Sequence, residues 1–138
     1  MSNQQIYVNL PVRNLAASRQ FFAALGFELT PQFSDDNAAC MIVSPDHIYV
    51  MLLAEPFFQT FIDKKIADAR TSTEVLLCLS RDSRAAVDDT VAKALAAGGS
   101  APRAPQDHGF MYQHSFEDLD GHIWELAYME SMPPSEGQ

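Results

Sequence analysis

The sequence predicts an α+β fold in which one strand–helix–strands unit occurs twice. Near the start, an apolar run at 6–12 leads through Asn14 into an alanine-rich amphipathic segment that ends at Gly26. Past the midpoint, an apolar run at 75–79 leads through Ser83 into a similar segment. A helix covers one face of each sheet, so pairing the two units would hide both uncovered faces. We expect the paired units to form a curved sheet around a cavity, a common location for small-molecule sites.

Composition narrows the classes of protein that the chain could belong to. Its 138 residues suit a single domain, and a hydrophobic content of 47% suffices for a packed core. The formal net charge of −9 disfavours nucleic acid and anionic membranes as partners. No apolar run is long enough to span a bilayer, and the N-terminal residues lack the features of a signal peptide. We expect a cytoplasmic protein.

The first unit is expected to cover 1–68. Asn14 is a good N-cap and Gly26 a good terminator for the first helix. Three strands are expected after this helix, at 27–33, 39–43 and 48–53. Pro56 suits the first position of a helix, and apolar residues at helical spacing predict a short helical insertion near 56–66.

The second unit is expected to cover 69–130. Ser83 can cap its helix, and we expect strands before and after it, at 74–80, 110–116 and 123–128. Residues 118–121 form a tight turn, 102–109 an irregular loop, and 131–138 a flexible tail. Cys40 and Cys78 lie in apolar runs, so both are expected to be buried, reduced thiols.

Three segments give the chain a resemblance to the vicinal oxygen chelate superfamily: Asn9 to Leu15, Phe21 to Phe27 and Asp118 to Glu125. That superfamily includes glyoxalase I, extradiol dioxygenases and bleomycin-resistance proteins. Residues 105–112 also resemble a poorly characterised group related to lactoylglutathione lyase. The resemblance implies two paired βαβββ modules and, commonly, a homodimer.

The resemblance also implies where a divalent metal would bind. Metal-using members hold the ion with His, Glu or Gln side chains from the first and last strands of each module. The matching positions here are Tyr7, Met51, Glu74 and Glu125. Tyr7 and Met51 are unusual ligands for such an ion, and two carboxylates alone hold a catalytic metal poorly. We therefore assign no cofactor, and Glu74 and Glu125 are the ligands if a metal binds.

Two carboxylates are candidates for proton transfer. Glu125 lies between Trp124 and Leu126 on a strand expected to be largely buried, where an unpaired charge is costly. It is either a general base or metal ligand, or a structural carboxylate bound to a backbone group or an arginine. Glu74 could face Glu125 and share a proton with it, or it could be an exposed residue at a strand end.

Other polar side chains have two interpretations each. His114 shares a strand face with Tyr112 and Phe116. It is a proton carrier if that face lines the cavity and a packed core residue if the face contacts a helix. Tyr7 and Asn9 lie opposite the apolar set of the first strand, where they could orient a ligand or bind backbone groups.

Two functions fit these residues better than a purely structural partner role, which would not explain the cavity, and whether the protein is an enzyme stays open. In the first, Glu125 removes a proton next to a carbonyl in a lyase or isomerase reaction, with Glu74 or His114 as second proton carrier. A bound divalent metal would instead favour a lyase or a dioxygenase-like activity. In the second, a metal-free protein sequesters a drug or metabolite, as bleomycin-resistance relatives do. In both, the residues expected to bind the small molecule are Tyr7, Asn9, Met51, Phe57, Phe61, Tyr112 and Trp124.

Overall fold

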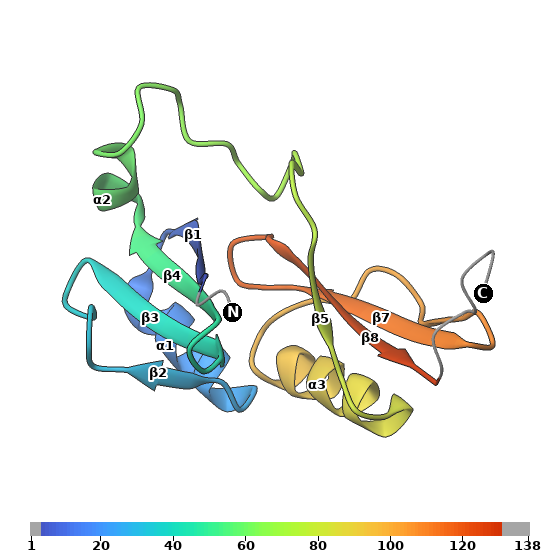
Figure 1. The fold of residues 1–138 in the computed structure, drawn as a ribbon. Coiled ribbons are helices and arrows are strands. Elements are labelled where there is room, and N and C mark those ends of the chain that lie inside the picture. Colours follow the sequence, from blue (N-terminus) through green and yellow to red (C-terminus); the bar gives the residue numbers. More distant parts are fainter. Residues whose placement is uncertain (1–3, 131–138) are drawn as a thin grey trace, which may run out of the picture. The chain divides into compact units, whose positions relative to one another are not determined.

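The computed structural model describes residues 4–130, so the tail predicted at 131–138 lies outside the described residues. The chain divides into two compact units, the first ending at Asp68 and the second beginning at Ala69 (Figure 1). None of the helices in the described part is both long enough and apolar enough to cross a membrane.

The first unit forms a four-stranded mixed sheet with a helix on one face. Its elements in chain order are β1 (Ile6–Val12), α1 (Leu15–Ala24), β2 (Glu28–Thr30), β3 (Ala38–Ser44), β4 (Ile48–Ala54) and α2 (Glu55–Gln59). The strand order is β1-β4-β3-β2, and β1 runs parallel to β4 while the other pairs are antiparallel. This is a βαβββ arrangement with α2 added at its end.

Helix α1 forms because its ends and its apolar face suit a helix. The Asn14 side chain accepts a hydrogen bond from the backbone N–H of Ala17 at 3.0 Å, as predicted for an N-cap. Phe21 and Phe22 are buried with their rings edge to face, and the helix contacts β2, β3 and β4. Burying each such large side chain contributes roughly 1.5–3 kcal/mol. The residues that complete this core include Leu10, Val12, Leu15, Leu25, Val50 and Leu52.

The second unit repeats this arrangement. Its elements are β5 (Leu77–Ser80), α3 (Arg84–Ala96), β6 (Gln106–Asp107), β7 (Met111–Glu117) and β8 (Ile123–Met129). The strand order is β5-β8-β7-β6, with β5 parallel to β8. Ser83 caps α3 by accepting a hydrogen bond from the N–H of Ala86. The α+β class with two βαβββ units is therefore confirmed.

Some predicted elements are shorter in the structure. Strand β2 ends at Thr30, directly before Pro31. The helix predicted near 56–66 ends at Gln59, because the Thr60 hydroxyl and three successive i to i+3 backbone hydrogen bonds close the chain after it. The strand predicted at 74–80 begins only at Leu77, and the loop predicted at 102–109 contains the two-residue strand β6.

The turn before β8 is organised by one buried carboxylate. Asp118 is 6% exposed and accepts hydrogen bonds from the N–H groups of Asp120 and His122 and from the indole Nε1 of Trp124, at 2.9, 3.0 and 3.0 Å. Burial raises the pKa of this carboxyl, although His122 and the bond from Trp124 oppose the shift. The bond to Trp124 holds the indole on the helix side of β8.

Gly121 in the same turn lies against the start of the second unit. Its φ is +93°, which favours glycine, and a Cβ atom placed there would lie 2.9 Å from backbone atoms of Ala69 and Arg70. The Arg70 side chain also donates a hydrogen bond to the carbonyl of Leu119 at 3.2 Å. The turn and the segment 69–70 are thus packed too closely for any side chain at position 121.

We expect Gly121→Ala to destabilise the protein by more than the left-handed backbone alone would cost. Gly26 provides the matched control, because its φ is +98° but a Cβ atom added there would have no neighbouring atom within 4 Å. Gly26→Ala should cost about 1–2 kcal/mol from backbone strain, and Gly121→Ala clearly more. Urea unfolding measures the free energy of unfolding of both variants. An equal decrease in the two variants would contradict the close packing around Gly121.

Candidate functional site

Alternation along β4 and β8 determines which side chains reach the face of each sheet that its helix leaves uncovered. Val50 and Leu52 are buried, so Met51 between them points to the opposite face of the first sheet. In the second sheet Trp124 and Leu126 are fully buried, and Glu125 between them is partly exposed. Met51 and Glu125 therefore occupy equivalent positions in their units.

The first unit contains a cavity of about 370 Å³ on this open face. It is lined by Asn9, Phe33, Ser34, Asp35, Ala38, Met51, Leu53, Phe57 and Phe61. Asn9 and Met51 are partners in the parallel pairing of β1 and β4. The rings of Phe57 and Phe61 contact each other edge to face, with centroids 5.1 Å apart. The cavity thus has aromatic walls and a few polar groups, a composition typical of ligand sites.

The structure brings together four of the residues predicted to bind a small molecule: Asn9, Met51, Phe57 and Phe61. Tyr7 does not line the cavity. The residue is 45% exposed, its ring stacks on Tyr49 with centroids 4.9 Å apart, and its hydroxyl donates a hydrogen bond to the Gln5 side chain at 3.0 Å. Phe33 ends the strand predicted at 27–33 and Asp35 follows that strand, so no sequence signal indicated that either residue lines a cavity.

That loop is held by side chains from neighbouring elements. The Arg19 guanidinium on α1 donates hydrogen bonds to the backbone carbonyls of Asp35 and Ala38, the latter at 2.9 Å. The Asp35 carboxylate accepts from the N–H groups of Asn37 and Ala38, at 2.8 and 3.1 Å. The Ser34 hydroxyl donates to the Thr30 carbonyl. These bonds fix the part of the cavity wall that lies outside the sheet.

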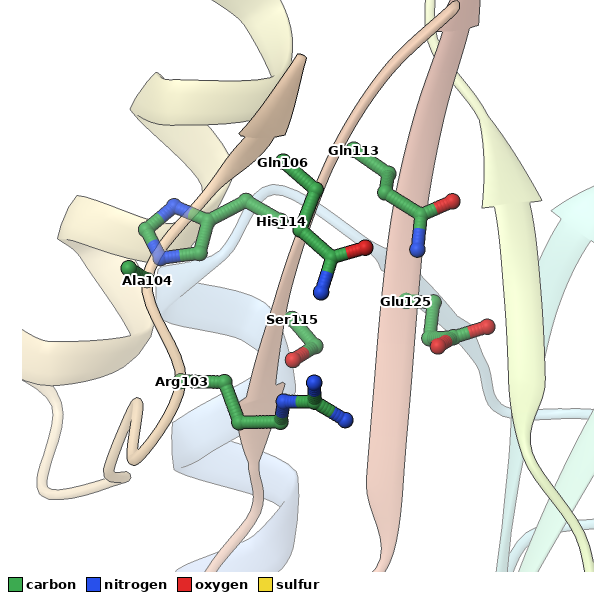
Figure 2. Close-up of a pocket in the computed structure, with 7 residues that line it drawn as sticks. All are labelled: Arg103, Ala104, Gln106, Gln113, His114, Ser115 and Glu125. Carbon is green, nitrogen blue, oxygen red and sulfur yellow. The ribbon is translucent and has the colours of Figure 1, made fainter. Parts of the chain in front are cut away.

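In the second unit, Glu125 lies beside a small polar hollow of about 30 Å³, large enough for a water molecule. Figure 2 shows the side chains of Arg103, Ser115 and Glu125 around this hollow, together with the amides of Gln106 and Gln113. Neither the Arg103 guanidinium nor the Glu125 carboxylate has a hydrogen-bond partner within residues 4–130. No sequence signal identified Arg103.

The side chains of three predicted site residues contact the helix side of the second sheet, although His114 also contributes to the lining of the polar hollow. Trp124 is 0% exposed and is bonded to Asp118. Tyr112 donates a hydrogen bond to Asp88 on α3 at 2.6 Å, and His114 Nδ1 lies 4.0 Å from the same carboxylate. Figure 2 shows the His114 imidazole pointing away from Glu125. The cause is the two-residue repeat of a strand, which separates these side chains from Glu125.

Glu74 does not face Glu125 from the neighbouring strand, as one interpretation required. It is exposed and precedes β5. Cys78 is the residue of β5 that pairs with Glu125, and it is exposed rather than buried as predicted, whereas Cys40 is buried. Partial shielding of the Cys78 sulfur and the charge of Glu125 raise the pKa of this thiol. The predicted strand began at Glu74, three residues before the observed start of β5 at Leu77.

The side chains around these sites do not suit a resident divalent metal. No group of three or more His, Cys, Asp or Glu residues in the described part of the chain could hold an ion. Of the positions implied by the resemblance, Glu125 lies beside the cation Arg103, and Met51 lines an aromatic cavity.

Comparisons with known proteins agree with this fold. A family profile described as bleomycin resistance protein-like N-terminal matches residues 4–44. A hypothetical protein from S. aureus, SA1046, is 28% identical over 90% of this chain and 92% of its own, with a TM-score of 0.77. A glyoxalase-related enzyme from Fulvimarina pelagi is 19% identical over 96% and 93%, with a TM-score of 0.79.

The fosfomycin resistance protein FosX from Mesorhizobium loti is 15% identical over 93% of each chain, with a TM-score of 0.66. Among curated proteins no sequence matches the chain. The two βαβββ units give the chain the fold of solved proteins described as glyoxalase/bleomycin resistance/dioxygenase family proteins. Its residues 4–44 are similar to the N-terminal part of bleomycin resistance-like proteins.

Proposed function

We propose that the protein binds a small, partly apolar molecule in the aromatic cavity of its first unit, without a metal. The observation that carries this proposal is the cavity of about 370 Å³, which falls in the usual range of about 300–1,000 Å³ for ligand sites. Phe57 and Phe61 offer apolar walls, and Asn9 offers an amide to orient a polar group.

Sequestration of a drug or metabolite is the form of binding that we favour. The region similar to bleomycin resistance proteins, residues 4–44, includes the cavity residues Asn9, Phe33 and Asp35. Binding of this kind requires shape and apolar surface but no proton carrier. We also propose that the protein forms a homodimer, as the resemblance implies. We further propose a cytoplasmic location, because both cysteines are free thiols and thiols stay reduced in the cytosol.

Filling the cavity should abolish ligand binding. Met51 lies in the middle of β4 and lines the cavity, so Met51→Trp would place an indole inside it. We would screen small aromatic and aliphatic metabolites by thermal shift. A ligand at 100 times its Kd should raise the free energy of unfolding of wild-type protein by about 2.7 kcal/mol. The same compound should cause no thermal shift in Met51→Trp.

The matched control is Ile48→Trp, which adds the same indole at the exposed start of β4, away from the cavity lining. This variant should keep the ligand-induced thermal shift. If Met51→Trp is folded and still responds to the compound as wild-type protein does, the ligand does not occupy this cavity.

A second function, proton transfer at Glu125, is favoured by the polar hollow of the second unit. The Glu125 carboxylate is partly exposed and lacks a hydrogen-bond partner within residues 4–130, so it is available to accept a proton. Arg103 and Gln113 could hold the carbonyl oxygen of a substrate while Glu125 takes a proton from the adjacent carbon. The resulting activity would be that of a lyase or isomerase, with neither His114 nor Glu74 taking part.

Exchange of carbon-bound hydrogen tests this second function. If Glu125 is a base, wild-type protein should accelerate exchange of the hydrogens next to the carbonyl of hydroxyacetone in D₂O, followed by NMR. Glu125→Gln should slow that exchange by about 100-fold or more, because it removes the proton acceptor. Glu117→Gln, on β7 in the same sheet, serves as control and should exchange at the wild-type rate. Equal rates in all three proteins would exclude Glu125 as the base.

A further inference from the structure

Phe33 has a backbone conformation that a phenylalanine rarely adopts. Its φ is +59°, in the left-handed region where a bulky side chain meets steric resistance. Among the described residues, Asp46 is the other non-glycine with a positive φ, at 68°. Asp46 lies in the turn between β3 and β4, and aspartate is common in such turns. Phe33 is therefore the case that requires an explanation.

Packing within the chain does not explain it. Phe33 is 73% exposed and has no ring contact with another aromatic residue in the part of the chain from 4 to 130. A side chain so exposed gains little from the hydrophobic effect. Glycine would adopt the same backbone conformation without strain. For folding alone, position 33 would be better occupied by glycine.

The surrounding loop nevertheless holds Phe33 firmly. Arg19 binds two backbone carbonyls of the loop, Ser34 binds the end of β2, and Asp35 binds two N–H groups that lead into β3. These contacts lie directly after Phe33 in the chain, and they keep its side chain on the wall of the aromatic cavity. A strained residue kept in place by its surroundings is a common property of binding sites.

We infer that Phe33 is retained in this conformation to contact a flat aromatic ring of the bound molecule. This inference rests on the proposed binding function of the same cavity. Phe57 and Phe61 already contact each other at 5.1 Å, whereas Phe33 has no aromatic partner within residues 4–130. A flat ring beside Phe33 would gain an aromatic contact in addition to burial, and a saturated ring of the same size would gain burial alone. The cavity thus selects ligands that carry an aromatic ring.

Two probes with one carbon skeleton test this selectivity. 2-Naphthol is flat, and decahydro-2-naphthol is its saturated counterpart. Wild-type protein should bind 2-naphthol more tightly in fluorescence titration and competition. Phe33→Leu, which keeps an apolar side chain but removes the ring, should weaken 2-naphthol binding by about threefold to tenfold and leave the saturated probe nearly unchanged.

Phe33→Gly and Asp46→Gly separate strain from binding. Both remove a left-handed non-glycine residue, and the hydrogen bonds at Asp46 use its backbone atoms, so glycine retains them. Both variants should unfold at a higher urea concentration than wild-type protein. Only Phe33→Gly should also lose affinity for 2-naphthol. This result would show that the phenylalanine at position 33 lowers the stability of the fold but contributes to binding.

The failures of the two proposals can be told apart. If both probes bind equally well and Met51→Trp blocks them, the cavity binds ligands but Phe33 does not select aromatic rings, and the inference is wrong. If neither probe binds, both the inference and the proposed cavity function are wrong. If Phe33→Gly changes the association state in sedimentation without changing 2-naphthol affinity, Phe33 serves contact with a second copy instead, which also overturns the inference.

Discussion

Burial of alternate residues along the last strand of each unit is the constraint from which the candidate sites follow. Val50 and Leu52 in β4, and Trp124 and Leu126 in β8, are each at most 3% exposed. Because these residues are committed to the core, the residues between them must point to the other face. A one-residue shift would place Glu125 in the core, where an unpaired carboxylate is costly. The register of each strand is therefore strongly determined.

The same framework presents different chemistry in the two units. In the first, Met51 beside Asn9 opens onto an aromatic cavity completed by α2 and the loop before β3. In the second, Glu125 beside Cys78 opens onto a polar hollow with Arg103. The apolar surface of the aromatic cavity favours binding by burial of a ligand. The polar groups of the hollow in the second unit favour proton transfer. The two units thus share a fold but carry different side chains at equivalent positions of their open faces.

Local signals in the sequence predicted the framework well. Asn14 and Ser83 are caps whose side-chain hydrogen bonds form as predicted, and the apolar runs became β1, β4 and β8 with correct approximate bounds. The position of Trp124 could also have been predicted, because two neighbours in a strand cannot face the same cavity. Expecting both Trp124 and Glu125 beside a ligand ignored that alternation.

Other features depend on contacts that no local pattern contains. Phe33 lies on the cavity because Arg19, distant in the sequence, ties the following loop to α1. Arg103 lies beside Glu125 because an irregular segment returns to the sheet before β6. Cys78, rather than Glu74, is the neighbour of Glu125 because β5 begins at Leu77. Side-chain positions of this kind are determined by tertiary packing.

Binding of a small molecule in the aromatic cavity of the first unit can be mapped residue by residue in an NMR titration. Amide signals of ¹⁵N-labelled protein should move on addition of 2-naphthol, and the largest shifts should fall on β1, residues 31–37, β4 and α2. Shifts centred on Glu125 and Arg103, or scattered over both units without saturation, would show that 2-naphthol does not bind in this cavity.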